Sequence, residues 1–239
     1  MSNALEGNKS ELKIPLADHS DEQISIIIVH KDRPEYLNLC LQSICVTTFN
    51  SNHEIIVVDN GSDKESLDFL DDIEGTVKVV RNDKNLYWSA ACNKGAKAAD
   101  PNSKYLVFMH CDIVITNPSW LDLLLNVSES TNSGFVGLDT QTYTMGNQDV
   151  SFLQDHLIMM TREGWNEIGP WPEELPQIGP AFILTMRAQA KGYKPQIMKT
   201  PIIHHYKIFS LGINDYERLQ EEAIGVLPKL VSQVQSKSL

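Results

Sequence analysis

Short apolar runs that end in polar residues constrain the fold of this chain more than any other feature of its sequence. Residues 105–109 form such a run, which leads directly into His110, Cys111 and Asp112. A five-residue apolar run is typical of a strand buried on both faces, as in a parallel sheet. If the strand continues, side-chain alternation places His110 and Asp112 on one side of the chain. These two side chains either bind a metal ion or serve as a cap and a structural hydrogen-bonding group.

Similar apolar runs recur along the first half of the chain, with helical patterns between them. Strands are expected at residues 24–29, 54–58, 77–80, 105–109 and 135–138, and helices at residues 34–47, 64–72, 85–99 and 120–127. Asp32 is expected to cap the first of these helices. Strands that alternate with helices predict an α/β fold, a mostly parallel, doubly wound sheet with helices on both faces.

The pattern changes in the second half. Residues 140–149 are polar and contain glycine, so a loop is expected there. A short strand follows at residues 157–160, then helices at 161–168 and 181–191, and an amphipathic helix at about 214–234. We therefore expect a loose N-terminal tail (residues 1–23), a single domain (residues 24–210) and a C-terminal helix and tail (residues 211–239).

Polar side chains collect just after the expected strand ends. They are Asp32, Asp59, Asn60, Arg81, His110 and Asp112. Because ligands bind at the carboxyl ends of strands in open α/β sheets, this layout predicts a nucleotide site. The alternative for residues 59–61 is a tight turn without a ligand.

The net charge of −11 argues against binding to nucleic acid or to anionic membranes through bulk charge. No stretch approaches the ~20 apolar residues of a membrane span, and the first residues lack a secretory signal pattern. The cysteines (Cys40, Cys45, Cys92 and Cys111) form no C-x-x-C pair. Most of them are interpreted as small core residues in a reducing compartment. These features predict a cytoplasmic protein without a transmembrane segment.

Taken together, several motifs resemble the family 2 glycosyltransferases, which have the GT-A fold. Residues 24–44 are similar to the family's opening strand and helix, and residues 54–62 (EIIVVDNGS) to its nucleotide-binding strand and turn. Residues 85–95 (NLYWSAACNKG) follow its N-x-G-F-x-x-x-x-N-x-G pattern, with Tyr87 where glycine is usual. Residues 105–121 resemble the strand with the metal motif, and residues 187–193 the R-x-x-x-x-G-Y pattern. The resemblance divides the domain into a nucleotide-binding half (residues 24–138) and an acceptor half (residues 139–210).

The resemblance implies an enzyme of polysaccharide biosynthesis that moves a sugar from a UDP- or dTDP-linked nucleotide-diphospho-sugar donor to a hydroxyl of a saccharide or lipid-linked acceptor. Asp59 and Asn60 would contact the base and ribose. The full set of implied donor-binding residues is His30, Asp32, Asp59, Asn60, Arg81, Asn85, Trp88, Asn93 and His110. Mn²⁺ or Mg²⁺ would be bound by Asp112, with His110 and with His204 or His205 as further ligands.

Two departures from the family pattern bear on the chemistry. His110 replaces the first aspartate of the metal motif, and Pro180-Ala181 stands where the family has a Glu-Asp pair. Neither proline nor alanine can act as a general base, which inverting transfer requires. Glu174 and Asp155 are the candidate replacements. The alternatives are a retaining reaction that needs no protein base, and a degenerate GT-A domain that binds a nucleotide sugar or a protein partner without transfer. A nucleotidyltransferase is disfavoured, because the chain lacks a glycine-rich, basic opening loop.

Overall fold

A seven-stranded sheet forms the centre of the molecule. The structure is a computed structural model, and it describes residues 21–48, 51–145, 148–207 and 213–236. The strand order is β10-β6-β9-β4-β1-β2-β3. The strands are β1 (Ile24–His30), β2 (His53–Asp59), β3 (Lys78–Arg81), β4 (Tyr105–His110), β6 (Phe135–Gly137), β9 (Leu157–Thr161) and β10 (Gln196–Ile197). The first half of the chain thus supplies the β4-β1-β2-β3 half of the sheet.

The pairing of these strands fits the predicted sheet. β1 runs parallel to both β2 and β4, and its isoleucines alternate between the two faces. β9 is the exception, because it runs antiparallel to both β4 and β6. The amino end of β9 therefore lies at the same edge of the sheet as the carboxyl end of β4. The prediction of a mostly parallel α/β sheet is confirmed.

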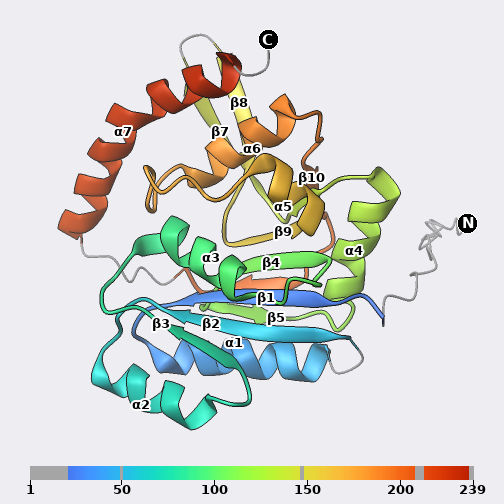
Figure 1. The fold of residues 1–239 in the computed structure, drawn as a ribbon, viewed down its shortest axis with the longest axis vertical. Helices are drawn as coiled ribbons and strands as arrows, with labels where there is room; N and C mark the ends of the chain where they lie inside the picture. Colours follow the sequence, from blue (N-terminus) through green and yellow to red (C-terminus); the bar gives the residue numbers. More distant parts are fainter. Residues whose placement is uncertain (1–20, 49–50, 146–147, 208–212, 237–239) are drawn as a thin grey trace, which may run out of the picture.

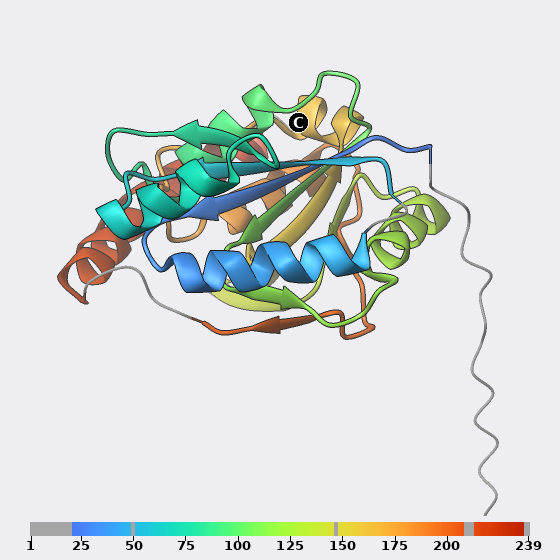
Figure 2. The ribbon, with the colours of Figure 1, turned by 90° about the horizontal axis from the view of Figure 1, so that it is seen from below.

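Helices cover both faces of the sheet (Figures 1 and 2). One face packs against α1 (Pro34–Thr47), α2 (Lys64–Ile73) and α4 (Trp120–Thr131), and the other against α3 (Tyr87–Ala98), α5 (Arg162–Ile168) and α6 (Pro180–Ala190). Ile26 and Ile28 point to the first face and Ile27 to the second, and all three are fully buried. Each such side chain stabilises the fold by ~1.5–3 kcal/mol. Two apolar layers therefore hold the sheet rigid.

The C-terminal helix α7 (Ile213–Ser236) adds a third apolar cluster outside α6 (Figure 1). Leu227, Leu230 and Val231 of α7 are buried against Phe182 and Ile183 of α6. The predicted amphipathic helix is thus present and its apolar stripe faces the domain. None of the helices in the described ranges is both long and apolar enough to cross a membrane.

Three expectations from the sequence are wrong. Residues 140–149 are not a loop, because β7 (Thr140–Met145) and β8 (Gln148–Leu153) pair as an antiparallel hairpin. The threonines and Tyr143 favour a strand, and the segment looks polar only because its side chains at 141–144 are exposed. Asp32 does not cap α1, because its carboxylate instead accepts a hydrogen bond from the Asp63 backbone N–H. Cys45 is exposed, since it lies on the outer side of α1.

Candidate functional site

A cavity of about 360 Å³ opens at the carboxyl ends of β1, β2 and β4. This is the edge at which open α/β sheets bind ligands, and the volume suits a small molecule. Aromatic side chains, including Tyr87 and Trp88, and three kinds of polar side chain line it. The cations are Lys31, Arg33 and Lys207; the amides are Asn60, Asn85, Gln154 and Gln177; and the imidazoles and carboxylate are His110, His205 and Asp112.

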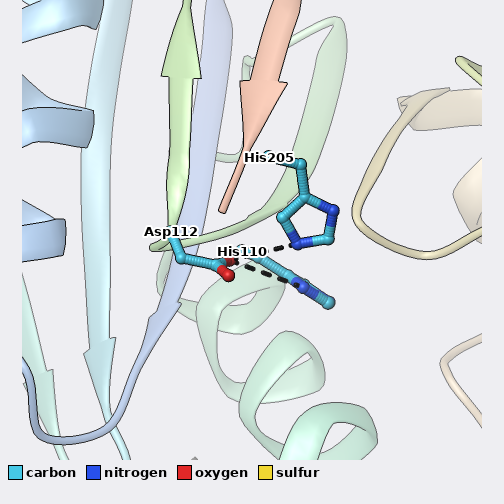
Figure 3. Close-up of side chains that lie close together, drawn as sticks. All are labelled: His110, Asp112 and His205. Atoms are coloured by element: carbon cyan, nitrogen blue, oxygen red, sulfur yellow. Dashed lines mark ion pairs between the residues drawn. The ribbon is translucent and has the colours of Figure 1, made fainter. Parts of the chain in front are cut away.

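His110, Asp112 and His205 form a compact cluster at one side of the cavity (Figure 3). Their ligand atoms all lie within 4.8 Å of one another. The Asp112 carboxylate Oδ1 is 3.3 Å from His205 Nε2 and 3.9 Å from His110 Nδ1. The chain turns sharply after β4, so His110 and Asp112 converge without the strand continuing between them. Two imidazole nitrogens and one carboxylate oxygen are a donor set that suits a divalent transition metal.

A short strand pair brings His205 to this cluster from the far end of the domain. β5 (Ile113–Ile115) follows Asp112 directly and pairs antiparallel with β11 (Ile203–His205), with His205 opposite Ile113. Alternation along β11 sends the neighbouring His204 the other way, where it is exposed and its ring packs on Tyr206 at 4.6 Å. Of the two histidines predicted as possible ligands, the structure therefore places His205 in the cluster and His204 outside it.

Asp155 and His156 lie directly behind the cluster. Asp155 Oδ1 is 4.0 Å from His110 Nε2, on the opposite side of the ring from Asp112. Burial raises the pKa of the Asp155 carboxyl above its ordinary value. The His156 ring stacks on His205 at 5.1 Å, and burial lowers the pKa of His156 to about 4. His156 is not among the residues predicted from the sequence; an antiparallel β9 would have indicated it, because its position just before β9 puts it at the ligand edge.

The residues expected to bind the donor divide into two groups. Asn60, Asn85, Trp88 and His110 line the cavity. Asn60 also supports its wall, because its side-chain amide donates to the Tyr87 carbonyl at 3.0 Å and accepts from Asn82 Nδ2 at 3.0 Å. Asp59 lies just beneath, 1% exposed, with Oδ1 accepting from the Ser62 N–H.

The second group lies away from the cavity. Arg81 forms ion pairs with Asp71 at 2.6 Å and Glu74 at 2.8 Å. Its guanidinium therefore binds the C-terminal end of α2 and does not point into the cavity. The Asn93 amide exchanges two hydrogen bonds with the backbone of Trp171, both at 2.9 Å. Asp32 braces the segment before α2, as described above. The positions of Arg81 and Asn93 therefore favour structural roles over the donor contacts that the sequence suggested.

His30 is fully buried at the end of β1, beneath the cavity, and neither ring nitrogen has a hydrogen-bond partner among the described residues. Burial lowers its pKa from 6.5 to about 4, although Asp59 and Asp32 act in the opposite direction. Between pH 6.5 and pH 4, His30 binds a proton in the unfolded chain but stays neutral in the folded chain. His30 should thus favour folding fully above pH 6.5 and progressively less as the pH falls towards 4.

We expect His30→Met to reduce the acid sensitivity of the fold. The variant keeps a side chain of similar size and removes the titration, so wild type should lose up to roughly 3 kcal/mol more unfolding free energy than the variant between pH 7 and pH 4. Chemical denaturation at several pH values measures this difference. Parallel stability curves for the two proteins would contradict the assignment. His53→Met, at a half-buried surface histidine, is the control.

Five non-glycine residues in the described ranges have positive φ: Asp32, Arg33, Tyr87, Asn132 and Lys207. Arg33, Tyr87 and Lys207 line the cavity. For a residue other than glycine or asparagine this conformation costs about 1–2 kcal/mol. Tyr87 has φ 60, which explains why the pattern at this position usually carries glycine.

Pro180 and Ala181 form the first turn of α6 and are both buried. No carboxylate enters the cavity from this turn. Glu174 is exposed, and neither Glu174 nor Asp155 is among the residues that line the cavity. Of the two candidate replacements, Asp155 lies beside His110, with Oδ1 4.0 Å from Nε2, so its position favours it over Glu174.

The sequence model of glycosyl transferase family 2 matches residues 25–183, which is more than half of the chain. This chain belongs to glycosyl transferase family 2. Among curated relatives, the family 2 chain is similar to the uncharacterised protein y4gI of Sinorhizobium fredii, with 31% identity over 118 residues, covering 48% of this chain and 13% of y4gI. It is also similar to the O-antigen biosynthesis protein RfbC of Myxococcus xanthus, with 29% identity over 117 residues, covering 48% of this chain and 9% of RfbC. The chain thus matches only a small part of these relatives.

Solved structures share the fold of this family 2 chain at low identity. The mannosyltransferase PcManGT of Pyrobaculum calidifontis, in complex with GDP-Man and Mn²⁺, has a TM-score of 0.65 at 12% identity, covering 89% of this chain and 64% of PcManGT. S. aureus TarS 1-349, in complex with UDP-GlcNAc, has a TM-score of 0.62 at 15% identity, covering 90% of this chain and 72% of that one. The predicted GT-A fold is confirmed.

Proposed function

We propose that this family 2 chain is a metal-dependent glycosyltransferase that moves a sugar from a UDP- or dTDP-linked donor to a hydroxyl of a saccharide or lipid-linked acceptor. The observation that carries the proposal is the cluster of His110, Asp112 and His205 in the wall of the cavity. A polysaccharide substrate agrees with the name of RfbC, an O-antigen biosynthesis protein. A nucleotide-sugar donor agrees with the ligands of the PcManGT and TarS structures.

Asp112 would hold the metal with His110 and His205. A bound divalent ion would supply positive charge where the leaving diphosphate becomes more negative. The chemistry of this donor set argues against Mg²⁺, which prefers oxygen ligands, and favours Mn²⁺ or a similar metal that accepts imidazole. We therefore propose that the metal site is retained when His110 replaces the first aspartate, and that the site then binds Mn²⁺ in preference to Mg²⁺.

The cations of the cavity would bind the phosphates of the donor. Arg33 and Lys207 come from opposite ends of the domain and both line the cavity, as does Lys31, which also pairs with Asp32 at 3.0 Å. The chain has a net charge of −11, so three cationic side chains around one cavity make this region positive in an otherwise acidic protein. Charge-assisted hydrogen bonds from lysine and arginine to phosphate oxygens are strong and would orient the diphosphate.

Asp155 would take the proton of the acceptor hydroxyl. Its carboxylate lies beside His110, behind the cluster of His110, Asp112 and His205, and burial raises its pKa. A raised pKa makes the carboxylate a stronger base, which general-base catalysis requires. The hydroxyl would then attack the sugar carbon while the diphosphate leaves.

The second candidate function is binding of a nucleotide sugar without transfer. Pro180 and Ala181 at the start of α6 favour it, because they remove the carboxylates usual at that turn. A transferase turns over its nucleotide-sugar donor, whereas a protein that only binds the donor does not. Slow release of UDP or dTDP from a nucleotide sugar, dependent on the protein, indicates a transferase, whereas binding without release indicates the second function.

We expect nucleoside diphosphates to bind more tightly with a metal than without one, and more tightly with Mn²⁺ than with Mg²⁺. Calorimetric titrations of UDP, dTDP and GDP into the protein with Mn²⁺, with Mg²⁺ and with EDTA measure both effects. The affinity should fall at least about tenfold on chelation, since the ion would contribute a large share of the contacts to the diphosphate. Equal affinity with and without metal would refute the proposed site.

A further inference from the structure

The aromatic side chain of Tyr87 is kept at a backbone position that disfavours it. Tyr87 is the first residue of α3 and has φ 60. Asn132 shares this conformation but ends α4, where a left-handed residue is usual and asparagine tolerates it. Tyr87 differs from Asn132, because it begins a helix, where a left-handed residue is not usual. A glycine at this position would avoid the backbone strain. Residues held in such conformations cluster at ligand sites, and Tyr87 lines the cavity with the similarly strained Arg33 and Lys207.

The surrounding structure fixes the backbone of Tyr87. Its N–H donates to Asn85 Oδ1 at 2.8 Å, and its carbonyl accepts from Asn60 Nδ2 at 3.0 Å. The backbone N–H of the preceding residue, Leu86, donates to Asn60 Oδ1 at 3.4 Å. Both asparagines line the cavity themselves. The position of Tyr87 is therefore set by Asn60, which follows β2, and by Asn85, in the loop between β3 and α3.

The ring of Tyr87 is fixed from outside by the C-terminal helix. Arg218 of α7 donates a hydrogen bond from Nη2 to the Tyr87 hydroxyl at 2.8 Å, and its guanidinium carbon is 5.9 Å from the ring centroid. Arg218 is itself oriented by Glu222 at 2.7 Å and Asp215 at 3.4 Å, one turn away on either side. Figure 1 shows α7 extending from α6 towards the level of α3. One contact thus couples α7 to the wall of the cavity.

We propose that Tyr87 is a donor-positioning residue whose ring contacts the nucleotide, and that Arg218 holds the ring in place. The inference rests on the proposed function. An aromatic face between amides and cations suits a flat base linked to a diphosphate. It also explains why a strained tyrosine persists where glycine would serve the fold.

Four variants test this proposal. Tyr87→Gly removes both ring and strain, whereas Tyr87→Asn removes the ring but keeps a side chain that tolerates positive φ, so it controls for added flexibility. Tyr87→Phe and Arg218→Gln both remove the hydrogen bond from Arg218 Nη2 to the Tyr87 hydroxyl, and both leave an aromatic ring at position 87. Asn132→Gly is the matched control, because it changes a residue of the same conformation away from the cavity.

Each protein is examined by thermal unfolding without ligand and by calorimetric titration of UDP with Mn²⁺. Tyr87→Gly and Tyr87→Asn should unfold at or above the wild-type temperature, yet bind UDP at least about fivefold more weakly, the lower bound for losing an aromatic ring beneath a base. Tyr87→Phe and Arg218→Gln should match each other and lose less than about threefold. Asn132→Gly should bind like wild type. In donor kinetics, the KM should rise in the Tyr87→Asn variant while kcat changes little.

The outcomes separate this inference from the proposed function. If wild type binds UDP with metal and Tyr87→Asn binds equally well, the positioning role is refuted and the proposed function stands. If the Tyr87 variants unfold at lower temperature in proportion to their loss of affinity, the residue is structural and the inference is also refuted. If wild type binds none of UDP, dTDP and GDP, the proposed function fails and the inference fails with it.

Discussion

Asp112→Asn is expected to lower the rate of sugar transfer at least about 100-fold, because it removes the one negative charge of the His110, Asp112 and His205 cluster. The shape of the side chain is retained. The backbone carbonyl of Asp112, which accepts from the Tyr206 N–H at 3.0 Å, is untouched. The melting temperature without metal should therefore stay within a few degrees of wild type, while the affinity for Mn²⁺ falls.

Turnover of a nucleotide-sugar donor and calorimetry with Mn²⁺ measure the two effects. Asp68→Asn is the control, because Asp68 is an exposed aspartate of α2 paired with Lys64. It should change neither quantity. If Asp112→Asn retains wild-type turnover, Asp112 is not a metal ligand in the reacting complex.

Asp155→Asn should reduce kcat by about 10²–10⁴, the usual contribution of a positioned general base. An asparagine cannot accept the acceptor proton, but it fills the same space beside His110. Donor affinity should therefore change little. Glu174→Gln, at an exposed residue outside the cavity, is the control and should be fully active.

Single-turnover kinetics with a suitable acceptor check this prediction, and metal affinity distinguishes the two ways in which Asp155 can act. A loss of kcat with unchanged Mn²⁺ binding supports the role of base. A parallel loss of Mn²⁺ binding indicates that the carboxylate acts by orienting His110. Full activity in Asp155→Asn together with an inactive Glu174→Gln would reverse the assignment.

The parts of the fold that the sequence predicted well are those governed by local apolar patterns. Residues 105–109 are apolar throughout because both faces of β4 are buried, and this pattern needs no knowledge of distant residues. The hairpin of β7 and β8 was missed for the opposite reason. Its exposed side chains at 141–144 give β7 no buried face, whereas Val150 and Phe152, which pack β8 against the core, lie beyond residues 140–149.

Within the candidate site, the sequence could name Asp112 and His110 but could not choose between His204 and His205. That choice depends on the register of β11 against β5, which pairs His205 with Ile113. Arg81 shows the same limit, because Asp71 and Glu74 compete for its guanidinium from a neighbouring helix. His156 was missed because its relevance depends on the direction of β9, which the sequence left open.

The pairing of β5 with β11 also has a consequence for the order in which the molecule acquires its site. The sheet strands β1 to β4 and their helices lie in the first half of the chain, so during synthesis they are complete well before β11 is made. His205 lies on β11, so the cluster with His110 and Asp112 is complete only after β11 has paired with β5. During synthesis, the first half of the sheet can therefore form before the proposed metal site is complete, and metal uptake would report a late stage of folding.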